Sequence, residues 1–145
     1  MSWDVMIFAF ESPPPPMDEW TDDFHPPSMG KATQIREQIS HSLPQVDWSD
    51  PSWGHLAGGG YSIEFSLLKE DAIEGFMLHV RGGGNPLEAI CKLCRENGWY
   101  ALDCSTGDFI DLDAPSKKGW KGFQRYRDRV IGKLRKGSGK RGVEQ

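Results

Sequence analysis

The sequence has few cysteines and no long apolar run, and both absences narrow the class of protein. Three cysteines among 145 residues are odd in number and too few for a disulfide framework, so we expect a reducing compartment. No apolar stretch approaches the ~20 residues that cross a bilayer. The first residues, Met1 to Asp4, lack the basic segment of a signal peptide. We therefore expect a cytoplasmic protein that does not contact a membrane.

Metal-ligand spacing is also lacking. The histidines at positions 25, 41, 55 and 79 are scattered, and the one Cys-x-x-Cys pair, Cys91 and Cys94, has no second pair to complete a zinc site. This pair falls more than one turn inside an expected helix, on its apolar stripe, where core packing explains it better than redox chemistry. We expect no metal and no cofactor.

Charge is present in quantity and is unevenly distributed. The net charge of −4 combines −13 over residues 1–116 with +9 over residues 117–145. Either the basic C-terminal residues neutralise the acidic part of the same chain, or one of the two charged parts forms a surface that binds a partner.

Apolar periodicity places the elements of the fold. Alternating or continuous apolar runs predict strands over residues 3–10, 61–67, 76–81 and 99–104, the second and third forming a hairpin. Helical spacing predicts helices over 31–43 and 86–97, and then a short strand over 109–112 and a last helix from 116. Residues 46–54 are expected to form a turn-rich connection.

This order predicts an α+β domain of the ferredoxin-like β-α-β-β-α-β class. The helices would cover one face of an antiparallel sheet, with the short strand and the C-terminal helix added. We expect a single domain over 1–136, with a proline-rich loop over 11–30 and a flexible basic tail over 137–145.

The uncovered sheet face is the first candidate site. If Phe76, Leu78 and Val80 face the helices, alternation turns His79 and Arg81 the other way, beside Glu64. Asp4 and Asp103 would join this face from the first and fourth strands. Such a group could bind a charged partner or perform acid–base chemistry, or it could be a solvated face with cross-strand ion pairs.

Two weaker candidates follow along the chain. Gly82, Gly83, Gly84 and Asn85 precede a helix and could bind an anion through backbone amides. They match no phosphate-binding motif, and a tight connection explains them better. The basic residues of the last helix could bind nucleic acid. A pI near 5.5 and the helical spacing of its aromatic residues, which suits core contacts, argue against that.

Five short motifs carry a resemblance: MSWDV at 1–5, DPSWG at 50–54, YSIEF at 61–65, LHVRGG at 78–83 and LDCSTGDF at 102–109. Together they resemble a family of small uncharacterised bacterial proteins over about residues 1–131, without implying an activity. In its small size, acidity, single domain and cytoplasmic character, the chain is also similar to bacterial toxin-immunity proteins.

These observations predict a non-enzymatic, protein-binding domain, of the kind that includes toxin-immunity inhibitors. Its acidic surface would attract a basic protein partner. One alternative is a small-ligand or anion-binding enzyme that uses the sheet face and the glycine-rich loop. The other is nucleic-acid binding through the basic C-terminal helix.

Overall fold

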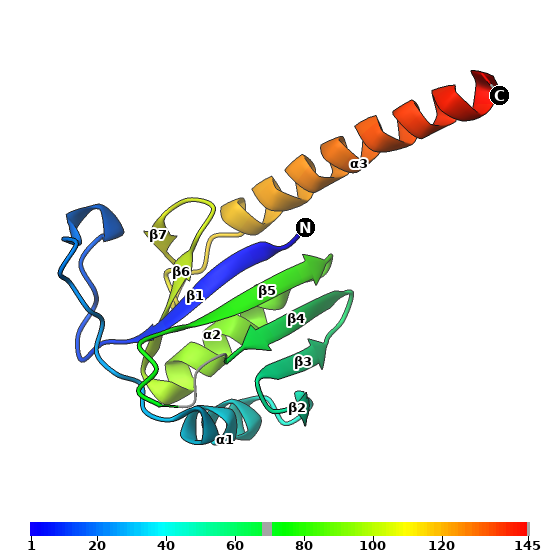
Figure 1. The fold of residues 1–145 in the computed structure, drawn as a ribbon. Coiled ribbons are helices and arrows are strands. Elements are labelled where there is room, and N and C mark those ends of the chain that lie inside the picture. The colour runs from blue at the N-terminus through cyan, green and yellow to red at the C-terminus, as the bar shows by residue number, and fades with distance from the viewer. Residues whose placement is uncertain (68–70, 145) are drawn as a thin grey trace.

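The structure, a computed structural model, describes residues 1–67 and 71–144 (Figure 1). The strands are β1 (Trp3–Ala9), β2 (Asp47–Asp50), β3 (Trp53–Ala57), β4 (Tyr61–Ser66), β5 (Phe76–Gly82), β6 (Trp99–Asp103) and β7 (Asp108–Phe109). The helices are α1 (Ala32–Ser42), α2 (Pro86–Asn97), α3 (Lys118–Glu144) and the 3-10 turn η1 (Met17–Glu19). Within the described residues, no helix combines the length and apolar character needed to cross a membrane.

The seven strands of the described residues form one antiparallel sheet in the order β2-β3-β4-β5-β1-β6-β7. The expected β4–β5 hairpin is confirmed, with Glu64 opposite His79. On the other side of β5, His79 lies opposite Asp4 of β1. The four longer strands that the sequence predicts are therefore neighbours, in the order β4-β5-β1-β6.

The prediction of a turn-rich connection over residues 46–54 is wrong, because β2 and the start of β3 lie there. Two aspartate–serine turns make this segment resemble a loop in its sequence: Asp47 and Asp50 each accept hydrogen bonds from a serine two residues later. The apolar signal is weak, since glycine occupies one of the two inward positions of β3, where the ring of Trp48 covers Gly54. The fold is thus α+β with a larger sheet than expected.

Helices α1 and α2 cover one face of the sheet, and the core lies between the two layers (Figure 1). Ile35 and Ile39 of α1 and Leu93 of α2 are fully buried. Cys91 and Cys94 are buried in the same layer, as predicted, and burial raises the pKa of the Cys94 thiol to about 12. These cysteines are core residues and not a redox pair.

Helix α3 attaches to the rest of the chain through its first turns and then extends away (Figure 1). Trp120 is buried against Trp3, with 5.5 Å between ring centroids. The helix reaches Glu144 and so includes residues 137–144, which the sequence assigns to a tail. Tyr126, one of the aromatic residues expected to make core contacts, is 55% exposed, and Leu134 is 66% exposed. The apolar stripe of α3 thus has a covered and an uncovered part.

The proline-rich loop folds back onto one end of the sheet instead of extending into solvent. Trp20 packs edge-on against Phe8 of β1 at 5.4 Å and lies 4.8 Å from Phe24, as measured between ring centroids. Phe109 of β7 also approaches Trp20, at 6.3 Å. This aromatic cluster holds the loop beside the sheet face that α1 and α2 leave uncovered.

Candidate functional site

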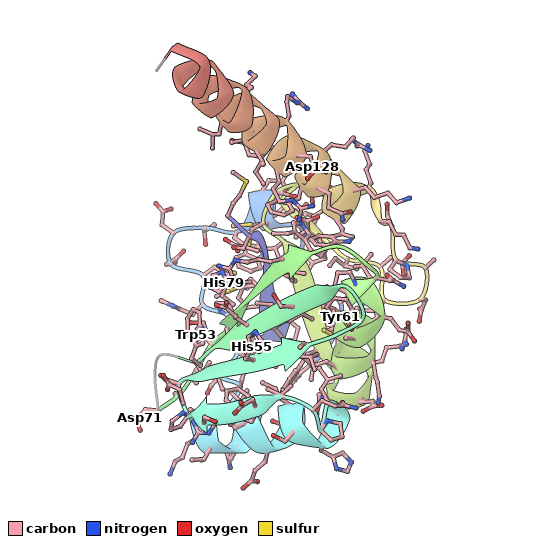
Figure 2. All side chains as sticks on the ribbon, turned by 90° about the vertical axis from the view of Figure 1, so that its right-hand side faces the viewer. Trp53, His55, Tyr61, Asp71, His79 and Asp128 are labelled. Carbon is pink, nitrogen blue, oxygen red and sulfur yellow. The ribbon has the colours of Figure 1, made fainter. Side chains whose placement is uncertain are left out.

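The sheet face opposite α1 and α2, called here the open face, carries a row of alternating histidines and carboxylates. Strand pairing places His55 beside Glu64, Glu64 beside His79, and His79 beside Asp4. Directly opposed residues of antiparallel strands point to the same side, so the four side chains share this face. Figure 2 labels His55 and His79 on neighbouring parts of the sheet. The structure therefore brings together Asp4, Glu64 and His79, as the sequence predicts.

Asp4 and His79 form the closest pair of the row. The Nδ1 atom of His79 lies 2.9 Å from Oδ1 of Asp4, and the Ser2 hydroxyl donates to the same oxygen at 2.5 Å. Ser2 Oγ is also 3.5 Å from Nδ1. A serine-protease triad needs the serine at one ring nitrogen and the carboxylate at the other. Because both groups approach Nδ1, this arrangement does not activate Ser2 as a nucleophile.

Trp53 of β3 covers the imidazole of His79. The two rings stack at 19°, with 5.6 Å between centroids, and the side chain of His79 is 23% exposed. Trp53 is not among the site residues expected from the sequence, because residues 46–54 are expected there to form a connection. The alternation of Trp53, His55 and Ala57 with inward residues is the signal that could have found it.

Arg81 is held by Glu64 through a hydrogen-bonded ion pair of 2.7 Å. The guanidinium is 41% exposed and the carboxylate 22%, so solvent screens the pair and its contribution to stability is small. The charges predicted for this face are thus largely paired with one another. A partner would meet a polar surface here on which Arg81 and His79 already have carboxylate partners.

Asp103 does not belong to this group. It pairs with Val5 in the β1–β6 register and is 5% exposed on the helix-covered side of the sheet. Its carboxylate accepts hydrogen bonds from the indole of Trp3 at 3.0 Å and from the amide of Ser105 at 2.9 Å. Asp103 lies directly against Gly119, in the first turn of α3, where a negative charge is favourable. We interpret it as a structural residue.

The glycine-rich loop after β5 carries the docked part of α3. Trp120 Nε1 donates to the carbonyl oxygen of Gly84 at 3.1 Å, and Arg127 donates to that of Gly82 at 2.6 Å. The amide of Gly83 donates to the carbonyl oxygen of Gly60. Carbonyl oxygens therefore face the neighbouring helix, and Asn85 has no side-chain capping bond to α2. This geometry favours a tight connection over an anion site.

An apolar cleft of about 680 Å³ opens at the end of the open face, between the proline-rich loop and the start of β5. Its apolar lining consists of Met6, Phe8, Trp20, Pro26, Leu67, Ala72, Ile73, Phe76 and Met77. Met6 and Met77 are paired across β1 and β5, next to the Asp4–His79 pair along the same strands. The cleft and the ionic row therefore form one continuous surface.

One acidic residue lines this cleft, and further exposed acidic residues adjoin its lining residues in the sequence. Glu74 lines it and lies 3.5 Å from His25. On the β5 side the exposed Asp71 directly precedes the cleft residue Ala72 in the sequence. On the loop side four exposed acidic residues flank Trp20 in the sequence, namely Asp18, Glu19, Asp22 and Asp23. We call these five residues, together with Glu74, the acidic rim of the apolar cleft. Sequence patterning could not show this, because the two sides are about fifty positions apart.

Within the part of the chain that the structure describes, no three histidine, cysteine, aspartate or glutamate side chains gather as metal ligands. No protein-family model, curated protein or solved structure matches the chain. The open face and its cleft therefore have to be interpreted from their own chemistry.

Proposed function

We propose that this protein is a non-enzymatic binding domain that holds a basic protein partner on its open face, as a toxin-immunity-type inhibitor does. The observation that carries the proposal is the acid-rimmed apolar cleft of about 680 Å³. Apolar surface supplies most of the affinity of protein interfaces, and charge around it steers the partner. The resemblance to small bacterial proteins and a cytoplasmic location are part of the same proposal.

The ionic row supports binding more than catalysis. Arg81 is paired with Glu64 at 2.7 Å and His79 with Asp4 at 2.9 Å. None of these four residues lines the cleft, so a small substrate held in the cleft would not touch them. A large partner that covers the open face would contact both the cleft and the row.

We further propose that β4-β5-β1-β6 with α1 and α2 forms a ferredoxin-like core, to which β2, β3 and β7 are added at the two edges. Strand order and the antiparallel pairing of all neighbours support this interpretation. In this arrangement the helices occupy one face and leave the other for recognition.

A second candidate is an acid–base enzyme, which the Asp4–His79 pair favours. A carboxylate at Nδ1 fixes the imidazole and orients Nε2 for proton transfer. A His79→Gln variant that still binds the partner with unchanged affinity, but loses a chemical activity of the complex, would favour this candidate.

Affinity capture from the native host tests the leading proposal. Wild type should retain one stoichiometric basic protein, and Met77→Lys should lose it because the lysine charge enters the apolar, acid-rimmed cleft. Thr33→Lys is the matched control: it adds the same charge on α1, at an exposed position on the far side of the sheet. Equal capture by Met77→Lys and wild type, or loss with Thr33→Lys, would contradict the proposal.

A further inference from the structure

The part of α3 that extends from the molecule is amphipathic. Lys121, Arg125, Arg129 and Lys133 recur at every fourth residue and form a basic stripe. Tyr126, Val130 and Leu134 recur in the same way, one residue later, and so lie about 100° around the helix from the basic stripe. A helix with separate basic and apolar stripes suits a surface that is both acidic and apolar.

The apolar stripe of this segment is uncovered in the single chain. Its members Tyr126 and Leu134 are 55% and 66% exposed, and the adjacent Ile131 is 37% exposed. Several glycines, including Gly132, lie within the helix, and each costs roughly 1 kcal/mol relative to alanine. An isolated helix of this composition is weak, so contact with another surface would stabilise it.

The acid-rimmed cleft has the complementary properties. Its floor is apolar, with Met6, Met77 and Trp20 among its lining residues, and Glu74 stands at its edge. The α3 of the same chain cannot occupy it, because that helix leaves from the other end of the sheet (Figure 1). Asp71, next to the cleft, and Asp128, on α3, lie at opposite ends of the molecule in Figure 2.

We propose that the cleft receives α3 of a second copy of this chain. The proposal rests on the proposed function, since both take the cleft to be a protein-binding site. The uncovered stripe around Tyr126 and Leu134 contacts the apolar floor, and the basic stripe lies near the acidic rim. The division of charge between the acidic residues 1–116 and the basic residues 117–145 is then the complementarity that joins two copies.

Other occupants of α3 fit the charges less well. Two α3 helices packed on each other would bring their basic residues together, which costs free energy. Nucleic acid would be attracted by the stripe but repelled by the acidic body, which carries −13. A second copy offers negative charge and apolar surface at the same place.

Sedimentation equilibrium of the full chain, from about 1 µM to about 300 µM, measures the association. Wild type should self-associate, and more weakly as salt rises from about 50 mM to about 500 mM. Leu134→Asp on the helix and Met77→Lys in the cleft should each weaken association by about tenfold or more, since each removes one buried apolar side chain. Leu134→Asp changes a 66% exposed position, so its folding should be unaffected. Circular dichroism verifies that both variants are folded.

Mixing the two variants is the decisive step. Leu134→Asp keeps an intact cleft and Met77→Lys keeps an intact helix, so the mixture should associate more tightly than either variant alone. A mixture that remains monomeric would overturn the proposal. A Met77→Lys variant that associates like wild type would also overturn it, because α3 would then pair with α3 or bind outside the cleft. A wild type that stays monomeric, whether or not it binds a duplex DNA probe, would also overturn it. Partner capture from the host is a separate readout, so the proposed function would survive such a failure.

Discussion

Replacing Asp103 by alanine should destabilise the fold by about 3–5 kcal/mol. Asp103 accepts hydrogen bonds from Trp3 Nε1 at 3.0 Å and from the amide and hydroxyl of Ser105 at 2.9 and 2.6 Å. Ser105 is exposed, so water can replace the bonds that it loses. Trp3 is 2% exposed, and its indole N–H would remain buried without an acceptor.

The magnitude follows from these contacts. A hydrogen bond to a charged acceptor contributes about 1.5–3 kcal/mol, and a buried donor without a partner costs about 1–3 kcal/mol. Asp103→Asn keeps the shape and one acceptor oxygen, so it should lose only about 1–2 kcal/mol. Asp4→Ala is the control, because Asp4 is 40% exposed and its pair with His79 should contribute less than about 1 kcal/mol.

Urea unfolding followed by tryptophan fluorescence measures these differences, provided that the denaturant dependence stays constant among the variants. This prediction would be contradicted if Asp103→Ala lowered the free energy of unfolding by less than about 1 kcal/mol, or if Asp4→Ala lowered it as much as Asp103→Ala. Either result would mean that Asp103 is not the buried acceptor of the Trp3 indole.

Three further predictions concern the glycine loop and the cysteines. Gly84→Ala should lower the free energy of unfolding by at least about 2 kcal/mol, because Gly84 has φ +63° and an added Cβ would collide with the carbonyl of Gly59. Gly59→Ala is the control: its Cβ meets nothing within 4 Å, so it should be nearly neutral in the same urea assay. Burial raises the pKa of Cys94 from 9.0 to about 12, so its contribution to stability is complete below pH 9 and is lost as pH rises toward 12. Wild type should therefore lose about 1.4 kcal/mol per pH unit more than Cys94→Ala in this range, and equal slopes would contradict the burial. In native protein an excess of thiol reagent should modify Cys104, which is exposed, before the buried Cys91 and Cys94, and Cys104→Ser should remove this early modification.

Local patterns predicted much of the fold because each predicted element has its own periodic signal. The alternation of Phe76, Leu78 and Val80 fixes both β5 and the side of the sheet to which His79 points. Residues 47–57 could not be assigned in the same way, since a glycine occupies an inward position of β3 and aspartate–serine turns dominate the composition.

A member of the candidate site could be predicted only where the alternation along its strand decides to which side of the sheet its side chain points. His79, Glu64 and Asp4 meet as expected. Asp103 does not, because a register in which it faces Val5 turns it to the opposite side, and register is a tertiary property. The cleft was not predictable, since it depends on how Trp20 in the proline-rich loop folds back over Phe8.

Hydrogen–deuterium exchange of the complex with the captured host partner tests the central claim, that the open face and its cleft bind a protein. We expect slower exchange on binding in residues 20–26 and 72–79, which border the cleft and include His79. Exchange in α1 should be unchanged, because that helix covers the other face. Protection confined to α1 and α2, with residues 20–26 and 72–79 unaffected, would show that the partner does not bind the open face and its cleft.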